Sequence, residues 1–344
     1  MITEKSENSA FENTEAAKVA SKTTMSASEK DPDAVFQQFE AAEEQDGCRI
    51  DKLLSLIYTD QSRSFFQKLI KNGKVTVNSQ PVSKNSFCVR AGDLVAVSIP
   101  KAASVRIEPE NIPLDILYED DDILIVNKPK GMVVHPAAGH YSGTLVNAVL
   151  YHCKDSLSGI NGEIRPGIVH RIDKDTTGSL IICKNDFAHS CIAGQIEEHS
   201  VKREYVGIVI GNIKEDMGTI DTWIARNPTD RKKMAVSPKG TGKQAVTHYR
   251  VLERFHGFTY VRFQLETGRT HQIRVHMASI SRPLLGDTLY GPGADKQPVR
   301  HLQGQTLHAE TIGFVHPRTG NYMEFHAPLP EYFEDLLVKV RKMT

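Results

Sequence analysis

Apolar residues in the C-terminal two thirds of the chain come mostly in runs of strand length. The runs cover residues 123–127, 180–184, 205–209, 246–252 and 259–266, whereas helical spacing is recognisable over 145–152, 188–196 and 271–280. Because helices and strands do not alternate regularly, a doubly wound parallel sheet is not expected. The pattern predicts an α+β domain with a largely antiparallel mixed sheet, and we place it at residues 112–344.

Residues 47–97 carry a smaller pattern of their own. Apolar residues repeat at helical spacing over 50–57 and 65–70, and they alternate as in strands over 74–78 and 93–97. Asn and Gly at positions 72 and 73 are typical of a helix end. The sequence therefore predicts a separate unit of two helices and a small sheet.

Two phrases in this unit resemble the S4 RNA-binding domain: RIDKLL at 49–54 and IKNGKVTVN at 70–78. The resemblance implies contact with structured RNA, in which Arg49 and Lys71 would take part. An S4 domain precedes many unrelated enzymes, so it does not by itself indicate which reaction follows.

The net charge of zero conceals a strong asymmetry along the chain. Residues 1–46 hold four lysines and eleven acidic residues, whereas residues 47–100 hold eight basic and three acidic residues. Such a basic unit favours a polyanionic partner, although a merely solvated basic surface is an equal alternative on charge alone. Residues 1–46 are too polar to form a core, so we predict a disordered acidic tail with a helical stretch near 35–44. Residues 98–111 are interpreted as a linker.

Several classes of protein are excluded by what the sequence contains. Its apolar runs are far shorter than the roughly 20 residues of a membrane-spanning helix, and its first residues lack the pattern of a secretory signal. Five cysteines without a CxxC pair give neither a disulfide framework nor a zinc ribbon. Residues 238–244 lack the complete pattern of a phosphate-binding loop. We expect a cytoplasmic protein that needs no metal and no cofactor.

The segment with the densest charge runs from residue 165 to 178 and leads directly into the apolar run at 179–183. Catalytic loops are often held in this way by a rigid buried strand. A charged turn without chemistry is the alternative, and composition alone does not decide between the two.

The residues GIVHRIDKDTTG at 167–178 resemble the signature of the RluA-type pseudouridine synthases. Further blocks match the same family in the same order, at 127–136, 202–205, 267–276, 286–291 and 307–309. Ile172, Thr177 and Ser179 depart slightly from the usual motif. The resemblance spans about 112–338, and it implies an isomerase that flips a uridine out of RNA and converts it to pseudouridine.

This resemblance assigns a role to individual residues. Asp173 would be the catalytic carboxylate, Arg274 the cation that keeps it charged, and Tyr205 the ring that stacks on the flipped base and is a candidate to remove its C5 proton. Asp175 would cap a turn. The remaining candidates are substrate-binding residues: Arg171, which would fill the vacated space or hold a phosphate, His170, Lys128 and Arg269.

Two other functions stay open at this point. One is an RNA-binding assembly factor that has kept the fold without its chemistry. The other is an RNA hydrolase in which Asp173 and Asp175 hold Mg²⁺. For the synthase, the S4-like unit together with the resemblance favours large-subunit ribosomal RNA or its precursor particle as the partner, with transfer RNA as an alternative. No obligate protein partner is expected.

Overall fold

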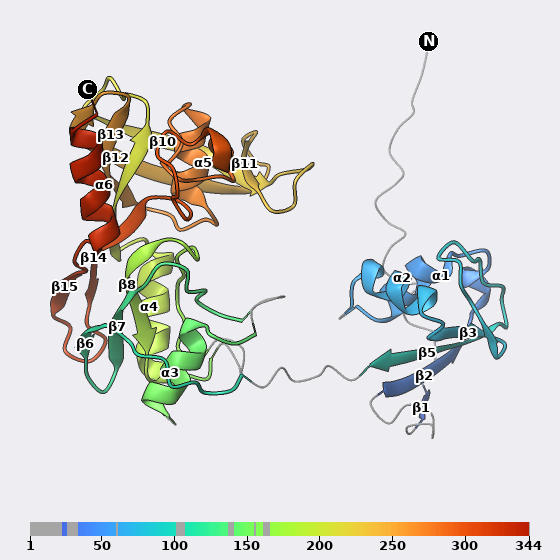
Figure 1. The fold of residues 1–344 in the computed structure, drawn as a ribbon. Coiled ribbons are helices and arrows are strands. Elements are labelled where there is room, and N and C mark those ends of the chain that lie inside the picture. The colour runs from blue at the N-terminus through green and yellow to red at the C-terminus, as the bar shows by residue number, and fades with distance from the viewer. Residues whose placement is uncertain are drawn as a thin grey trace, which may run out of the picture. The chain divides into compact units, whose positions relative to one another are not determined.

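A computed structural model describes residues 23–25, 34–59, 61–100, 107–136, 141–154, 156–160 and 166–343. The chain divides into two compact units, residues 1–104 and 105–344, and each is described by itself (Figure 1). Most of the predicted acidic tail, and residues 101–106 of the predicted linker, lie outside the described residues.

The first unit packs two helices on a small sheet. The helices are α1 (Ile50–Ile57) and α2 (Arg63–Lys71), preceded by the short helix η1 (Glu43–Gln45). The strands, in sheet order, are β1 (Thr23–Met25), β2 (Ala34–Glu40), β5 (Leu94–Pro100), β3 (Val75–Val77) and β4 (Gln80–Pro81), all antiparallel. Leu54, Phe66, Ile70 and Val97 are fully buried in their shared core.

The helix expected near residues 35–44 is wrong, because strand β2 occupies most of that stretch. Its backbone pairs with β5 from Ala34 opposite Pro100 to Glu40 opposite Leu94, and Phe39 is buried in the core of the unit. Tertiary pairing with β5 therefore overrides the local sequence pattern. This part of the predicted tail belongs to the folded unit.

The second unit is built on one large mixed sheet. Its strand order is β11-β10-β12-β13-β9-β14-β8-β7-β6, with β15 paired to β14. Every pairing is antiparallel except that of β14 with β8, which confirms the predicted fold class. The strands are β6 (Ile116–Glu119), β7 (Ile123–Lys128), β8 (Thr177–Cys183), β9 (Lys202–Ile210), β10 (Met217–Arg226), β11 (Met234–Ser237), β12 (Lys243–Phe255), β13 (Phe258–Leu265), β14 (Leu307–Val315) and β15 (Tyr322–His326).

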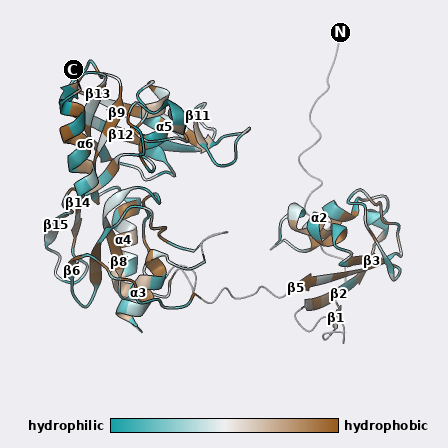
Figure 2. Cartoon of the chain, in the orientation of Figure 1, coloured by the Kyte–Doolittle hydropathy of each residue, from teal (hydrophilic) through white to brown (hydrophobic). Residues whose placement is uncertain are grey.

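Helices cover both faces of this sheet. The three predicted helices are present as α3 (Leu145–Cys153), α4 (Asp186–Glu197) and α5 (Gln272–Ser279), and α6 (Glu331–Arg341) and the short η2 (Ala294–Lys296) were not predicted. Helices α3 and α5 pack on one face, in a core that includes Leu180 and Phe263. Helices α4 and α6 pack on the other face. Figure 2 shows the apolar residues concentrated along the strands.

In the described part of the chain, no helix combines the length and apolarity that crossing a bilayer requires.

Strand β8 holds the predicted catalytic loop at the middle of the sheet. All seven of its residues are buried, between β7 on one side and β14 on the other. Gly178 has φ +110°, and a Cβ there would collide with the backbone of Ala309. Only glycine lets β8 approach β14 this closely, and the loop that precedes β8 is placed accordingly.

Candidate active site

A cleft of about 540 Å³ lies on the face of the sheet that α3 and α5 cover. Its walls come from the loop before β8, from the start of β9 and from the segment that leads into α5. The lining side chains on which the argument depends are Asp173, Arg203, Tyr205, Arg269, His271 and Arg274. The structure thus brings together the three residues predicted to be catalytic.

Asp173, Arg274 and Asp287 form a chain of ion pairs that leads from the cleft into the core. Arg274 Nη1 donates to Asp173 Oδ2 at 3.0 Å, and its Nε and Nη2 donate to the two oxygens of Asp287 at 2.7 and 3.0 Å. The side chain of Asp173 is 18% exposed, whereas that of Asp287 is 1% exposed. These carboxylates raise the pKa of Arg274 despite its burial. The arginine is therefore a fixed cation that presents one edge to the cleft.

Asp287 orients Arg274 because it is itself held by the backbone. Its Oδ1 accepts hydrogen bonds from the N–H groups of Leu289 and Tyr290 at 3.0 and 3.1 Å. A carboxylate that caps its own turn has little rotational freedom. The Tyr290 ring also lies beside the guanidinium, with 5.0 Å from Arg274 Cζ to the ring centroid.

Tyr205 and Arg203 lie on the same face of β9, two residues apart. Burial raises the pKa of Tyr205 to about 12, although the charge of Arg203 opposes the shift. Arg203 is 5% exposed, and its Nη2 donates to the carbonyl of Glu266 at 2.7 Å. Its buried Nε has no hydrogen-bond partner among the described residues. The wall of the cleft therefore holds a second buried guanidinium that sequence reasoning did not single out.

The structure places Lys128, a predicted substrate-binding residue, inside the protein. It is 1% exposed, and its ammonium donates to the carbonyls of Pro129, Met132 and Lys174 at 2.8, 2.9 and 3.0 Å. All three of its protons are thus used inside the protein. Lys174 follows Asp173 directly, so Lys128 fixes the backbone of the loop before β8, and its predicted contact with RNA stays a prediction.

We expect Lys128→Met to lower the free energy of unfolding by about 2–4 kcal/mol, because three buried carbonyls lose their donor. Burial lowers the pKa of Lys128 from 10.5 to about 7. The unfolded chain therefore binds more protons between those values, and this group adds to wild-type stability as pH rises from about 7 to 10.5. Urea unfolding at neutral pH and at about pH 9.5 should show the gap between wild type and variant widening.

The exposed Lys174 provides the control for this prediction, because its side chain lies on the same loop. Lys174→Met should leave stability nearly unchanged at both pH values. If Lys128→Met and wild type differed by the same amount at both pH values, the assignment of this titration to Lys128 would be wrong.

His170 and Arg171 occupy different positions although they are adjacent. His170 Nε2 accepts the N–H of Ile181 at 3.0 Å, and burial lowers the pKa of His170 to about 3. That nitrogen ties the loop to β8, and His170 also lines the cleft, so its predicted contact with RNA stays a prediction. Arg171 is exposed at the cleft, and its Nη1 lies 3.3 Å from Nε2 of His135. Its predicted contact with RNA stays a prediction.

Arg269 and Asp175 differ in their position relative to the cleft. Arg269 lines the cleft, and its Nε donates to the carbonyl of Gln244 at 2.8 Å. Asp175 is not among the lining residues, and its carboxylate packs against Gly304, where no Cβ would fit. No described group donates a capping hydrogen bond to it, so the predicted cap lacks support. Only Asp173 of the two lines the cleft. This disfavours a hydrolase in which both carboxylates would hold Mg²⁺.

Arg49 and Lys71 belong to the other unit. Arg49 precedes α1, and its guanidinium donates to the buried Asp51 at 3.1 Å. Lys71 is exposed in the last turn of α2. Both side chains are available to a ligand of that unit.

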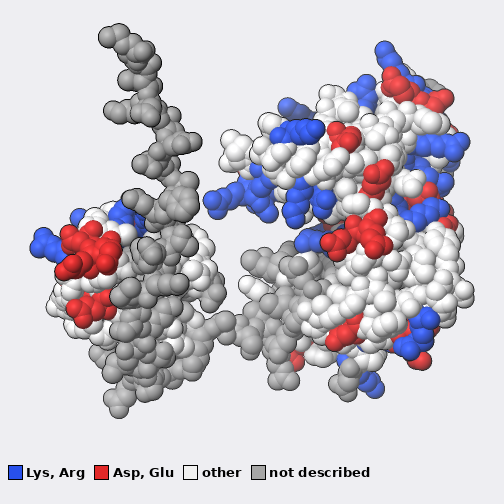
Figure 3. Space-filling model, turned by 180° about the vertical axis from the view of Figure 1, so that it is seen from behind, with Lys and Arg blue, Asp and Glu red and all other residues white. Residues whose placement is uncertain are grey.

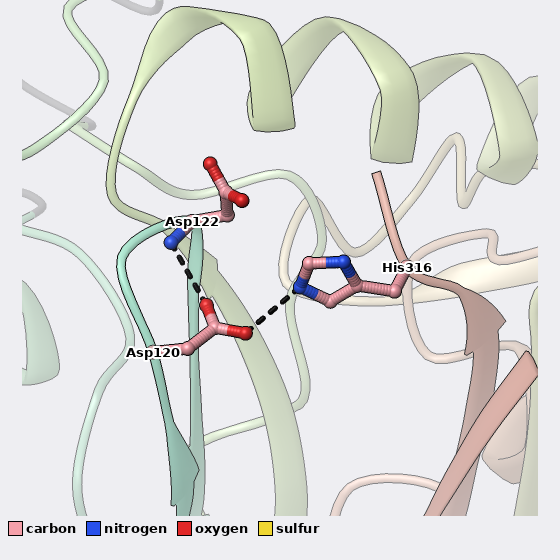
Figure 4. A group of neighbouring side chains, drawn as sticks. All are labelled: Asp120, Asp122 and His316. Atoms are coloured by element: carbon pink, nitrogen blue, oxygen red, sulfur yellow. Dashed lines mark hydrogen bonds and ion pairs between the residues drawn. The ribbon is translucent and has the colours of Figure 1, made fainter. Parts of the chain in front are cut away.

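A second cluster of ionisable residues lies outside the cleft (Figure 4). Asp120 Oδ2 lies 2.8 Å from Nε2 of His316, and Asp120 Oδ1 accepts a hydrogen bond from the backbone N–H of Asp122 at 2.8 Å. Asp122 is paired with Arg318 through bonds of 2.7 and 2.6 Å. Because protein donors already bind these carboxylates, the cluster braces the turn before β7 against the segment after β14.

His271, Arg203, Asp287 and Tyr290 were not predicted as site residues. Each lay inside a block that resembles the family, so position in the sequence was the available signal. A buried arginine or aspartate cannot be recognised from one sequence, because the pattern does not show which residues come from other blocks to meet it.

Comparisons with known proteins identify the family of the chain. The model of the RNA pseudouridylate synthase family matches residues 122–279, and that of the S4 domain matches residues 48–95. A solved structure of human RNA pseudouridylate synthase domain containing 1 superposes with a TM-score of 0.52 at 23% identity, covering 70% of this chain and 98% of its own. That likeness shows the fold.

Relatives of known sequence are much more similar. An uncharacterized RNA pseudouridine synthase of Bacillus subtilis is 52% identical over 88% of this chain and 97% of its own length. Proteins named ribosomal large subunit pseudouridine synthase D from Zymomonas mobilis and Pasteurella multocida are each 46% identical, over 94% and 90% of their lengths. These matches confirm both predicted resemblances, and the chain belongs to the RNA pseudouridine synthases, which are isomerases that act on RNA.

Proposed function

We propose that this enzyme converts uridines of large-subunit ribosomal RNA to pseudouridine, with Asp173 as the catalytic carboxylate. The observation that carries the assignment is the position of Asp173 in the cleft. One of its oxygens is bound to Arg274 at 3.0 Å, which leaves the other for the sugar or the base. The names of the relatives from Zymomonas mobilis and Pasteurella multocida support ribosomal RNA as the substrate.

The reaction breaks the bond from C1′ of the ribose to N1 of uracil and joins C1′ to C5 of the same base. The C5 proton leaves and N1 gains a proton, so no oxidant, reductant or group donor is consumed. Asp173 would attack C1′ or C6, or take the 2′ proton, and each route requires the carboxylate to be ionised. Arg274 Nη1 donates to this carboxylate at 3.0 Å.

Tyr205 would stack on the flipped base. It lies in the wall of the cleft, and unstacking costs a few kcal/mol that an aromatic surface can offset. Its pKa of about 12 keeps the phenol protonated at neutral pH. To act as the base for C5 it would have to lose that proton to solvent or substrate, and Arg203 is the neighbouring charge that makes this easier.

The basic surface of the catalytic unit supports RNA as the ligand. The hairpin from the end of β10 to the start of β12 carries six basic residues and one acidic residue. Figure 3 shows patches of Lys and Arg over the upper part of this unit. Such a surface binds phosphate groups irrespective of sequence. The basic side chains at issue are Arg226, Arg231, Lys232, Lys233, Lys239 and Lys243.

Pseudouridine mapping of total RNA tests the proposal. Cells that lack the gene should lose pseudouridines from large-subunit ribosomal RNA, and a plasmid copy should restore them. Loss confined to transfer RNA would overturn the substrate assignment. An unchanged map, with no isomerisation in vitro, would favour an assembly factor instead.

The S4 unit is expected to supply affinity. Asp51 is fully buried and accepts hydrogen bonds from Arg49, Arg63 and Gln67. Burial opposes ionisation, but these bonds outweigh it and lower the pKa of Asp51. This buried carboxylate therefore holds two exposed arginines in one orientation, in which they can contact adjacent phosphates.

We predict that Asp51→Asn weakens binding of structured RNA several-fold without slowing turnover at saturating RNA. Both arginines keep their charge, so the salt dependence of binding should hardly change. Lys71→Gln provides the contrast, because losing one phosphate contact should lower the salt slope by about one. Filter binding at several salt concentrations measures both. Unchanged affinity in Asp51→Asn would contradict the role given to this carboxylate.

Full activity is predicted to persist in excess EDTA with no small molecule added. The proposed chemistry uses side chains alone, and the hydrolase alternative would need Mg²⁺. The substrate should be an oligonucleotide that folds without Mg²⁺, so that the chelator acts on the enzyme only. Loss of activity there, with recovery on adding Mg²⁺, would support the hydrolase.

In the proposed domain division, residues 47–97 bind RNA, residues 112–344 catalyse the reaction, and a linker joins them. The proposed location of the protein is the cytoplasm. Strand β2 extends the RNA-binding unit toward the N-terminus. A deletion meant to remove that unit should therefore begin before residue 34.

A further inference from the structure

We propose that His271 is a positioning residue for Asp173, held as the neutral Nε2–H tautomer by the hydroxyl of Tyr290. The inference rests on the proposed function, since it assumes that Asp173 performs the chemistry. It concerns the side of Asp173 that Arg274 does not reach.

His271 faces the free oxygen of Asp173. Its Nε2 lies 3.8 Å from Asp173 Oδ1, whereas Arg274 binds Oδ2. This distance is longer than a hydrogen bond. A small shift of the loop when RNA enters would close it, as catalytic contacts often tighten only in the substrate complex. The two donors then fix the plane of the carboxylate from both sides.

The tautomer follows from a chain of three hydrogen-bonding groups. The backbone N–H of Met234 donates to the Tyr290 hydroxyl oxygen at 2.7 Å, and that oxygen lies 2.7 Å from His271 Nδ1. With Met234 as donor to the oxygen, the hydroxyl proton is free to point at Nδ1, which then accepts it. The ring proton of a neutral imidazole must therefore sit on Nε2, facing Asp173.

The neutral form of the His271 imidazole matters because charged groups surround the ring. Burial lowers the pKa of His271, and the nearby arginines add to this shift while the carboxylates oppose it. An imidazolium would place a second full positive charge beside Oδ1 and pull it into an ion pair, which makes the carboxylate a weaker base and nucleophile. The charged and titratable groups around the ring are Asp173, Arg274, Asp287, Arg171 and Tyr290.

The backbone of His271 supports a dedicated role. It has φ +58° and precedes α5, in the left-handed region that side-chain-bearing residues rarely adopt. Such strain persists where the surroundings enforce it, and it occurs often at functional sites. Here it turns the imidazole to a place between Tyr290 and Asp173.

The first experiment measures single-turnover rates of Tyr290→Phe between about pH 5.5 and 8. The ring stays beside Arg274, but Nδ1 loses the donor that kept it unprotonated, so the pKa of His271 should rise. We expect a modest slowing at the alkaline end and an added acid limb, falling up to about tenfold per pH unit below the new pKa. Tyr260→Phe, a half-buried tyrosine of β13 outside the cleft, is the matched control and should follow wild type.

His271→Asn tests the ring itself, because asparagine tolerates the left-handed backbone. We expect a rate loss of about 10- to 100-fold, unchanged RNA binding, and no added acid limb even when combined with Tyr290→Phe. Nitrogen NMR of wild type with labelled histidine, assigned with this variant, should show an unprotonated Nδ1 and a protonated Nε2 at neutral pH.

Three results would overturn the inference: the opposite tautomer or an imidazolium at neutral pH, a Tyr290→Phe profile parallel to wild type, or full activity of His271→Asn. The NMR result does not depend on activity, so it decides even if Tyr290→Phe fails to fold. If Asp173→Asn proved active, the proposed function would fail instead, and the two failures are thus distinguishable.

Discussion

Asp173→Asn is expected to abolish isomerisation while RNA binding stays intact. Asparagine keeps the shape of the side chain but cannot act as an anion beside the sugar. Arg274 and Asp287 would still pair, so the wall of the cleft should keep its form. Release of tritium from RNA labelled at uracil C5 measures the loss directly, because that proton leaves only when the new carbon–carbon bond has formed.

Two further variants make this result specific. Arg274→Lys keeps a positive charge but loses the planar fork that binds Asp173 and Asp287 together, so it should be much slower without being inactive. Asp175→Asn changes a carboxylate two residues away that does not line the cleft, and it should cost little rate. Tritium release near the wild-type rate in Asp173→Asn would refute the assignment, as would a folded but inactive Asp175→Asn.

Asp287→Asn is expected to damage stability and rate together. Arg274 would lose a buried partner that binds it at two points, and breaking a buried ion pair typically costs about 3–5 kcal/mol. The guanidinium would also be free to turn away from Asp173. We expect a fall in the free energy of unfolding of about that size and a rate loss of at least about 100-fold, measured by urea unfolding and single-turnover kinetics.

Asp122→Asn is the matched control, because Asp122 is another buried carboxylate paired with an arginine at two points. It lies outside the cleft, so it should lower stability without a comparable loss of rate. The role given to Asp287 is wrong if its variant is destabilised yet turns over normally, or if both variants lose rate equally.

Local sequence patterns allowed much of the fold to be predicted. Where they failed for strand β14, the burial of its residues in the structure explains why. Strands β7, β8, β9, β12 and β13 and helices α3, α4 and α5 coincide with predicted segments. Strand β14 escaped prediction because most of its residues are buried on both faces, which removes the alternation that marks a half-buried strand. Helix α6 did carry a signal, since its buried residues Phe333, Leu336, Leu337 and Val340 repeat at helical spacing.

The residues of the site likewise include some that sequence motifs could predict and some that they could not. Asp173 and Arg274 could be assigned because their motifs resemble a family, and the structure brings them within 3.0 Å. The burial of Lys128 could not be predicted, because a lysine in a motif suggests an exposed cation, whereas three backbone carbonyls hold it in the core. Burial and partners of this kind come from contacts between distant segments, which local sequence patterns do not encode.

The parallel pairing of β8 with β14 also sets when the enzyme can first become active. Thr177 and His308 are linked across it although 131 positions separate them, and 101 positions separate Asp173 from Arg274. At synthesis rates of about 5–20 residues per second, Arg274 follows Asp173 out of the ribosome's active centre by roughly 5–20 s. During that interval β8 has an unpaired edge and Asp173 lacks its partner Arg274. Each newly made chain must therefore be extended through β14 before both of these contacts can form.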